Sequence, residues 1–502
     1  MPQRFKRVLI ANRGEIAVRI ARTLREIGIC PIAVYSDADR LSPHVRACDM
    51  AYHLGPSPAN ESYLRIELLL EVAKKSKADA IHPGYGFLSE NAEFAEAVEA
   101  AGITFIGPSG AAMRKMGSKT AARDAMRLAN VPSVPGSDGP LADEAQAVRI
   151  AEKIGFPIML KASAGGGGKG MRFVESAKDV AEALRAARSE AENAFGDSTV
   201  YMEKAIVQPR HVEIQIMGGP DGRSIWLGER ECSMQRRHQK VIEETPCIAI
   251  DETIRRAMGE VACRAADAVD YVGAGTVEFL LDADKNFYFL EMNTRLQVEH
   301  PITELCCGID LVEAQVRVAE GHALPWSQEE IKRHGHAIEA RIYAEDPEQN
   351  FLPSPGRIVE AVLPQGPGIR VDCGVASGFE VPRYYDPMIA KVIVWGEDRE
   401  RARLRMDRAL RETAFKGIKT NNLFLRHLLH YPDFIKGHYD TGTAAIVLKE
   451  PPPAPPQALL DVAVAAMVVN AYQRDMNTAR QVATSEPSKA TWRNPMWRMR
   501  GG

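Results

Sequence analysis

The sequence predicts an α/β protein of several units, and three observations lead to this prediction. Short apolar runs alternate with segments of helical periodicity in residues 1–110, which is typical of a parallel sheet with crossover helices. Four glycines interrupt a strand pair in residues 157–174. Two acidic residues face one another across a second strand pair in residues 276–295. A chain of 502 residues is too long for one core, so about three or four lobes are expected.

The N-terminal unit is predicted to contain four short strands, at residues 7–11, 31–35, 78–82 and 103–106. Asn12 and Glu15 are spaced as a capping box at the start of a helix. The apolar positions of that helix follow at helical spacing, at Ile16, Ile20, Leu24 and Ile27. Asp37 would suit a dinucleotide site, but the turn at residues 12–15 lacks the GxGxxG pattern. The glycine-punctuated loop at residues 82–90 either lines a site or is a plain turn.

A linking helix is expected at residues 110–131, and a smaller unit begins near residue 134. The glycine run of this unit lies between two predicted strands, at residues 157–161 and 171–174. A Walker loop would need Lys-Ser/Thr and an immediate helix, whereas a strand follows Lys169-Gly170. The run is therefore predicted to cap a hairpin as a mobile flap that closes over phosphates. A flexible loop without a ligand is the alternative.

The strand pair at residues 276–295 carries a metal-binding pattern. If its turn centres on residues 284–285, Glu278 faces Glu291 and Leu281 faces Tyr288. Asn293 lies on the same face as Glu291, because strand side chains alternate. Facing carboxylates repel unless a cation lies between them, and oxygen ligands on a rigid hairpin suit Mg²⁺ or Mn²⁺. A solvated hairpin face with chance acids is the alternative.

Three more segments carry candidate site groups. Arg295, Gln297 and Glu299 alternate directly after the metal hairpin, which indicates a polar, substrate-sized constellation. Residues 231–240 are either a solvated turn or an anion site formed by Gln235, His238 and Lys240. In the strand at residues 336–345, Glu339, Arg341 and Tyr343 share one face. An arginine there is expected to have an anionic partner, either a structural glutamate or a ligand.

Composition excludes several classes of protein. The 63 basic and 66 acidic residues leave a net charge of −3, which provides no global field for nucleic acid or membrane. We find no run of 18 apolar residues and no signal-peptide core. The eight cysteines lack CxxC spacing, so reduced thiols and a cytoplasmic location are expected.

The chain changes character after residue 448. Residues 449–456 form a proline-rich linker, and a segment of this composition is stiff and extended. Residues 458–472 are apolar and compatible with a helix, and the end of the chain contains Trp492, Trp497 and three arginines. This tail is predicted to dock on a partner, with a disordered terminus as the alternative.

Taken together, these motifs resemble the biotin carboxylase family, whose members have the ATP-grasp fold. The resemblance rests on five segments, at residues 10–16, 81–91, 161–170, 232–240 and 291–301. It spans residues 5–448 and excludes the tail. It implies a Rossmann-like N-terminal domain (1–115), a linker helix (116–133), a glycine-flap lid (134–206), an ATP-grasp and biotin carboxylase C-terminal domain (207–448) and a separate tail (449–502).

The resemblance also implies roles for individual residues. The metal ions, two of Mg²⁺ or Mn²⁺, would be held by Glu278, Glu291 and Asn293. Bicarbonate would be bound by Lys240, Arg295, Gln297 and Val298, with Glu299 as the general base. Biotin would contact Arg341 and Tyr85, and the catalytic set would comprise Glu299, Arg341, Lys240 and Arg295. ATP would be bound by Lys119, Lys161, Gly166, Gly167, Gly168, Glu203, Lys204, Ile206, His211, Gln235 and His238.

The implied reaction is ATP-dependent carboxylation of biotin with bicarbonate, through carboxyphosphate. The family carries biotin on the lysine of an Ala-Met-Lys-Met sequence, which this chain lacks. The expected partners are therefore a separate biotin carboxyl carrier protein and a carboxyltransferase subunit, with the chain itself in a homo-oligomer. The complex would act on acetyl-CoA or propionyl-CoA, and a pyruvate carboxylase is the alternative. Another ATP-grasp carboxylate–amine ligase, or a catalytically dead scaffold subunit, also remains open.

Overall fold

The computed structural model describes residues 4–137, 139–162, 171–450 and 457–484. The chain divides into two units, Met1–Lys449 and Glu450–Gly502, which are described separately below. The predicted flap, residues 165–170, lies outside the described residues. The residues of the linker 451–456 and of the end 485–502 also lie outside them.

The N-terminal part of the first unit is a five-stranded parallel sheet in the order β3-β2-β1-β4-β5. Its strands are β1 (Arg7–Ile10), β2 (Cys30–Ser36), β3 (Met50–Gly55), β4 (Ala80–His82) and β5 (Thr104–Phe105). Its helices are α1 (Gly14–Glu26), α2 (Pro43–Ala47), α3 (Ile66–Ser76) and α4 (Ala92–Ala100). The predicted parallel sheet is confirmed. The edge strand β3 was not predicted, because its half-exposed residues form no apolar run.

The predicted capping box at α1 is wrong. Arg13 occupies the N-cap position, and no side chain caps the helix. The Asn12 amide instead donates hydrogen bonds to the carbonyls of Pro83 (2.7 Å) and Tyr85 (2.8 Å). Because β1 and β4 are parallel neighbours, the residues that follow them meet at one sheet edge. Asn12 therefore joins two loops at the edge where sites form.

The linking segment consists of two helices, α5 (Gly110–Gly117) and α6 (Lys119–Leu128), where one was predicted. Between them, Ser118 caps α6 by accepting a hydrogen bond from the Ala121 amide. A small antiparallel sheet in the order β7-β6-β8 follows. Its strands are β6 (Ile158–Ala162), β7 (Met171–Val174) and β8 (Val200–Lys204), and it packs against α7 (Glu144–Ile154) and α8 (Val180–Phe195).

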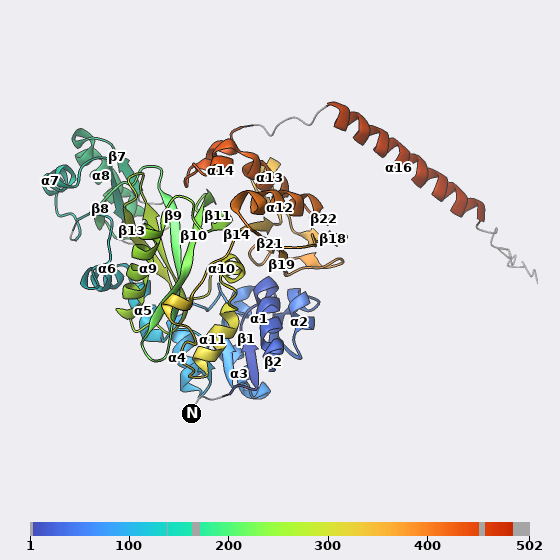
Figure 1. The fold of residues 1–502 in the computed structure, drawn as a ribbon, viewed down its shortest axis with the longest axis horizontal. Coiled ribbons are helices and arrows are strands. Elements are labelled where there is room, and N and C mark those ends of the chain that lie inside the picture. The colour runs from blue at the N-terminus through green and yellow to red at the C-terminus, as the bar shows by residue number, and fades with distance from the viewer. Residues whose placement is uncertain (1–3, 138, 163–170, 451–456, 485–502) are drawn as a thin grey trace, which may run out of the picture. The chain divides into compact units, whose positions relative to one another are not determined.

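An eight-stranded antiparallel sheet in the order β13-β12-β9-β10-β11-β14-β21-β19 forms the centre of the first unit (Figure 1). Its strands are β9 (Arg210–Gly218), β10 (Ser224–Arg236), β11 (Gln239–Thr245), β12 (Gly273–Leu281), β13 (Phe287–Asn293), β14 (His336–Tyr343), β19 (Ile369–Cys373) and β21 (Met388–Gly396). Three helices accompany it, α9 (Glu252–Asp267), α10 (His300–Cys307) and α11 (Leu311–Ala319).

The β14–β21 end of this sheet carries the last core of the unit. Three ribbons lie there, β15 (Glu345–Asp346) with β16 (Leu352–Pro353), β17 (Gly356–Arg357) with β20 (Glu380–Val381), and β18 (Glu360–Val362) with β22 (Ala414–Lys416). The helices are α12 (Arg399–Glu412), α13 (Asn422–His430), α14 (Pro432–Lys436) and α15 (Thr443–Val447). All eight cysteines are free, as predicted.

The β12–β13 hairpin is confirmed, but part of its predicted register is wrong. Glu278 pairs with Glu291 as predicted, whereas Leu281 pairs with Phe287 and not with Tyr288. The turn has one residue fewer than expected, because the Asp282 amide bonds the Asn286 carbonyl. A bulge then inserts Leu290 into β13, between the partners of Glu278 and Phe279. These two changes cancel, so the carboxylates still face one another.

The second unit contains one described helix, α16 (Gln457–Thr484), which includes the predicted apolar segment. Its large apolar side chains are exposed, among them Val462 (64%), Met467 (64%) and Val469 (54%). Neither α16 nor any other described helix combines the length and the hydropathy that a membrane span requires.

Candidate active site

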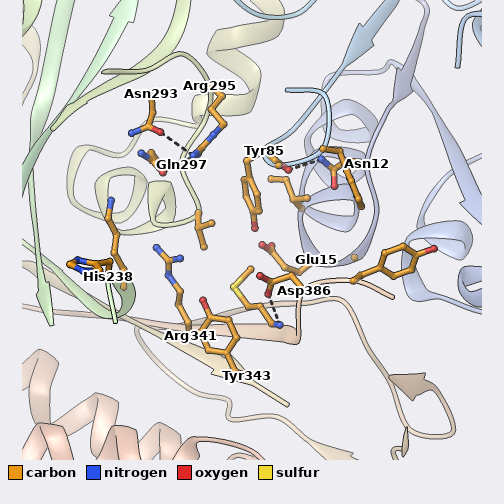
Figure 2. A pocket seen from close by; sticks show the side chains of 18 of the residues that line it. Asn12, Glu15, Tyr85, His238, Asn293, Arg295, Gln297, Arg341, Tyr343 and Asp386 are labelled. Atoms are coloured by element: carbon orange, nitrogen blue, oxygen red, sulfur yellow. Dashed lines mark hydrogen bonds between the residues drawn. The ribbon is translucent and has the colours of Figure 1, made fainter. Parts of the chain in front are cut away.

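A cavity of about 600 Å³ lies between the carboxyl edge of the N-terminal sheet and the central sheet. Helix α1 contributes Glu15, the loop after β4 contributes Tyr85, and strand β14 of the central sheet contributes Arg341 and Tyr343 (Figure 2). The predicted residues that line the cavity are Tyr85, His211, Gln235, His238, Lys240, Glu278, Glu291, Asn293, Arg295, Gln297, Val298 and Arg341. The structure thus brings together segments that are more than 250 residues apart in sequence.

Lys240 is the cationic centre of this site. Its Nζ lies 2.6 Å from Glu213, 2.9 Å from Glu278 and 2.7 Å from Glu299. An ammonium has three N–H donors, and these three carboxylates engage them all. Burial alone would lower the pKa of Lys240, but the three carboxylates raise it well above its usual value. Lys240 is therefore charged at neutral pH and holds three carboxylates together.

Glu299 is fully buried and lies between two cations. Its Oε1 accepts from Lys240, and its Oε2 accepts from Arg341 Nη2 at 3.0 Å. Burial acts to raise the pKa of Glu299, but Lys240, Arg341 and Arg230 lower it well below the usual glutamate value. Glu299 is consequently ionised at neutral pH.

Arg341 has the anionic partners that its mid-strand position predicted, and both are glutamates of this chain. Its Nε donates to Glu243 at 2.6 Å, in addition to the bond from Nη2 to Glu299. Glu339, on the same strand face, has no hydrogen-bond partner among the described residues. Burial raises the pKa of Glu339 well above its usual value, whereas Glu243 and Glu299 are the carboxylates that contact Arg341.

The facing carboxylates Glu278 and Glu291 differ in their surroundings. Glu278 accepts hydrogen bonds from Asn293 (2.9 Å) and Gln297 (3.1 Å), and one of its oxygens lies 2.8 Å from His211 Nε2. Despite its burial, Lys240 and His211 hold the pKa of Glu278 far below the usual value. Glu291 has its pKa raised, by desolvation of its carboxyl group within the cavity and by the charge of Glu278.

This asymmetry is what two carboxylates produce when no cation separates them. The Glu291 residue as a whole keeps much of its surface exposed, and no hydrogen bond or ion pair with a described residue occupies its carboxylate, so its oxygens remain available as ligands. Two carboxylates and an amide oxygen on adjacent positions are a donor set that suits a hard divalent cation. The residues present therefore fit the predicted metal.

Arg295 is oriented by three neighbours. Its Nε donates to Glu90 at 2.8 Å, and its Nη atoms donate to Asn293 and Gln297, each at 3.0 Å. Glu90 belongs to the loop after β4 that the sequence marked as either a site or a turn, and it also accepts from the Thr294 amide. The N-terminal sheet thus supports the polar segment that follows the metal hairpin.

The residues predicted to bind nucleotide fall into two groups. His211, Gln235 and His238 line the cavity, and the Gln235 amide contacts His211 Nδ1 at 2.8 Å. Lys161, Glu203 and Lys204 lie on the small sheet, outside the cavity lining. Lys161 contacts the Glu203 carboxylate, while Lys204 donates to the carbonyls of Gly155 and Phe156.

The other five predicted nucleotide residues belong to neither group. Gly166, Gly167 and Gly168 lie outside the described residues. Lys119 begins α6, but the described part of the chain does not include its side chain. Ile206 follows β8 and is partly buried.

Sequence reasoning missed several residues of this site. Glu213, on β9, contacts Lys240, and Glu243, on β11, contacts Arg341. The fully buried Arg230 donates a hydrogen bond of 2.5 Å to Glu213. Residues 211–215 alternate as a strand does, but this pattern does not indicate which residue Glu213 contacts. Glu15 and Asp386 line the cavity as well (Figure 2), and Glu15 had been interpreted as a helix cap.

Comparison with known proteins agrees with this architecture. Residues 4–113 match the family model of the biotin carboxylase N-terminal domain, and residues 339–445 match that of the biotin carboxylase C-terminal domain. Residues 118–327 match the ATP binding domain of the carbamoyl-phosphate synthase L chain. These matches define the chain as a ligase of the ATP-grasp class.

The chain is 52% identical over 445 residues to a biotin carboxylase of Halalkalibacterium halodurans, covering 89% of this chain and 98% of that protein. It is also 52% identical to the alpha subunit of mitochondrial methylcrotonoyl-CoA carboxylase from Rattus norvegicus, covering 87% of this chain and 61% of that subunit. The chain therefore belongs to the biotin carboxylase family.

A solved structure extends the comparison. The biotin carboxylase domain dimer of Hydrogenobacter thermophilus 2-oxoglutarate carboxylase, in complex with MgADP, ADP and bicarbonate, superimposes with a TM-score of 0.82. It is 44% identical, with coverage of 89% of this chain and 100% of that domain. The predicted ATP-grasp fold class is confirmed.

Proposed function

We propose that the protein carboxylates biotin on a separate carrier protein, using ATP and bicarbonate, as the first half-reaction of an acyl-CoA carboxylase complex. The observation that carries this proposal is the ionised Glu299 held between Lys240 and Arg341 in the cavity wall. A paired carboxylate site adjoins it at Glu278 and Glu291. A base, an anion anchor and a metal site within one cavity are the groups that activation of bicarbonate by ATP requires.

Bicarbonate activation is assigned to the Lys240 side of the cavity. Lys240, Arg295, Gln297 and Val298 would hold the anion, and Glu299 would accept its proton. The resulting oxygen nucleophile attacks the γ-phosphorus of ATP, ADP departs, and carboxyphosphate forms. Because bicarbonate is a weak nucleophile, removal of its proton is the contribution of Glu299 to the rate.

The metal is assigned to Glu278, Glu291 and Asn293. Bound there, Mg²⁺ or Mn²⁺ would neutralise charge on the ATP phosphates. The protein supplies the geometry through Gln297 and His211, which hold Glu278 in place. Lys161, Glu203, Lys204, Ile206, His211, Gln235 and His238, together with Lys119 and the glycine loop, are proposed for the nucleotide.

Carboxyl transfer to biotin is assigned to Arg341, with Tyr85 beside it in the cavity. Carboxyphosphate breaks down to CO₂ and phosphate, the phosphate takes the proton of the biotin ureido N–H, and the nitrogen forms a bond to CO₂. Negative charge develops on the ureido oxygen as the N–H proton leaves, before the nitrogen bonds to CO₂. Arg341, whose guanidinium is fixed by Glu243, would stabilise that oxygen electrostatically.

The acceptor of the second half-reaction is proposed to be an acyl-CoA such as acetyl-CoA or propionyl-CoA. Identity to a methylcrotonoyl-CoA carboxylase subunit is 52%, whereas identity to the 2-oxoglutarate carboxylase domain is 44%. The similarity to an acyl-CoA carboxylase subunit supports this proposal, and a pyruvate-type carboxylase is the alternative. A homo-oligomer is proposed as well, since the 2-oxoglutarate carboxylase domain forms a dimer.

The function is tested with ATP, labelled bicarbonate and free biotin. We expect ADP release that requires both bicarbonate and biotin, together with label trapped as carboxybiotin. ADP release that depends instead on an amine and a small carboxylic acid would identify another ATP-grasp ligase. A protein that binds MgATP but releases no ADP would be the scaffold subunit.

We further propose that the tail docks on the carboxyltransferase subunit. The apolar side chains of α16 are exposed in the second unit, and a helix apolar on most faces is normally buried against a partner. A carrier protein has to move between active sites, so the stable contact is expected with the transferase. The carrier is the alternative occupant.

Truncation after Glu450 tests this docking. We expect carboxylation of free biotin to stay at the full-length rate, while co-elution with the transferase subunit is lost in size-exclusion and pull-down experiments. Val469→Asp should weaken assembly in the intact chain, because Val469 is 54% exposed, whereas Asp475→Asn serves as the matched control. Unchanged assembly after truncation would contradict docking, and loss of activity on free biotin would place the tail in the catalytic unit.

A further inference from the structure

Lys391 is a buried cation that the proposed reaction does not use directly. It lies on β21 with an exposed fraction of 0%. Its Nζ donates a hydrogen bond of 2.7 Å to the carbonyl of Val298. Val298 connects Gln297 to Glu299, so this bond holds the backbone of the segment proposed to receive bicarbonate.

The carboxylate that balances the charge of Lys391 belongs to Glu15, on helix α1 of the N-terminal part. Oε1 of Glu15, on α1, lies 3.5 Å from Nζ, and Glu15 is only 4% exposed. Asp372 lies at 3.9 Å but is already paired with Arg370 at 2.8 Å. Among the described residues, Lys391 is the only cation within 4.0 Å of the Glu15 carboxyl. The pair therefore joins α1 to the central sheet behind the cavity.

This arrangement is costly as a device for stability alone. Removing an ammonium and a carboxylate from water costs several kcal/mol for each ion, and a buried pair often gains little overall. Burial raises the pKa of Glu15 to about 7 even though Lys391 lowers it. The pair keeps the Lys391 ammonium directed at the Val298 carbonyl. Glu15 itself lines the cavity (Figure 2).

We propose that Lys391, held in place by Glu15, positions the Gln297–Glu299 backbone for bicarbonate. This inference rests on the function proposed above. The Glu299 side chain reaches Lys240 and Arg341 from one carboxylate, so a small rotation of its backbone would break one contact or the other. Without the ammonium, the Val298 carbonyl would lose its donor and the segment could rotate.

The test is Lys391→Met, assayed by ADP release while bicarbonate and ATP are varied separately. A displacement of about 1 Å in a positioned group can cost about 100-fold in rate. We therefore expect kcat/KM for bicarbonate to fall by about 100-fold, with KM for ATP at the wild-type value. Lys391→Arg should recover part of the loss, because it restores the donor. Glu15→Gln should also lower kcat/KM for bicarbonate, but by a smaller factor than Lys391→Met does.

Arg399→Met is the matched control. Arg399 is a largely buried cation that bonds Glu244 at 2.7 Å, and it does not line the cavity. Its loss should lower the melting temperature without changing the bicarbonate dependence. If Lys391→Met behaves like Arg399→Met, Lys391 is only structural and the proposal is overturned. If Lys391→Met does not fold, a wild-type kcat/KM for bicarbonate in Glu15→Gln overturns it. A wild-type protein without bicarbonate-dependent ADP release would refute the proposed function instead.

Discussion

Glu299→Gln is expected to abolish most of the biotin-dependent turnover while leaving the nucleotide bound. A general base contributes about 10²- to 10⁴-fold to a rate, and an amide cannot accept the bicarbonate proton. The fold should survive, because Lys240 keeps Glu213 and Glu278, and Arg341 keeps Glu243. Turnover is measured as ADP release with and without biotin, and nucleotide binding by calorimetry.

Glu231→Gln is the matched control for this variant. Glu231 is a buried carboxylate of β10 that is paired with Arg210 at 3.3 Å and does not line the cavity. Its loss should affect the melting temperature more than turnover. Turnover near the wild-type value in Glu299→Gln would eliminate the assignment of the base.

Glu291→Gln is expected to weaken binding of MgATP strongly. Changing even an outer group of a metal site costs about 10- to 100-fold in metal affinity, so loss of a direct ligand should cost about 100-fold or more. Asp284→Asn, at the exposed turn of the same hairpin, is the matched control. MgATP binding of wild-type strength in Glu291→Gln would contradict the metal site.

Although Glu291→Gln should weaken metal binding, it is expected to stabilise the folded protein when metal is absent. Because the pKa of Glu291 is raised in the folded state, its ionised form opposes folding. Below the ordinary glutamate pKa, about 4.3, both proteins are uncharged at this position and should be equally stable. As the pH rises above that value, wild-type stability without metal should fall relative to Glu291→Gln. Chemical denaturation at several pH values, with metal removed, measures this difference. A variant less stable than wild type near neutral pH would contradict the like-charge argument.

Local sequence patterns were sufficient where the structure depends on neighbours along the chain. Alternating apolar runs predicted the parallel N-terminal sheet, and Glu278 was placed opposite Glu291 by counting along the hairpin. That count succeeded although its turn was one residue too long, because the bulge at Leu290 restored the register. A bulge depends on how the hairpin packs in the sheet, so the pairing of Leu281 could not be derived from turn residues.

Other features of the site depended on residues that are distant in sequence. Asn12 and Glu15 have the spacing of a capping box, but Asn12 bonds the loop after β4 and Glu15 faces Lys391. A carboxylate that can cap a helix can equally pair with a buried cation, and local spacing does not distinguish the two. The mid-strand position of Arg341 was enough to predict an anionic partner. It could not show that the partners are Glu243 and Glu299, which lie far away in the sequence.

The sequence by itself determined the family, most of the N-terminal strands and the residue types from which the site is built, because these follow from motifs and from periodicity. The tertiary structure decided which charges meet. Lys240 contacts Glu213, Glu278 and Glu299, which come from three separate segments of the chain. The pKa of each buried group depends on these distances and on the loss of water around it. Those quantities exist only once the sheets have assembled around the cavity.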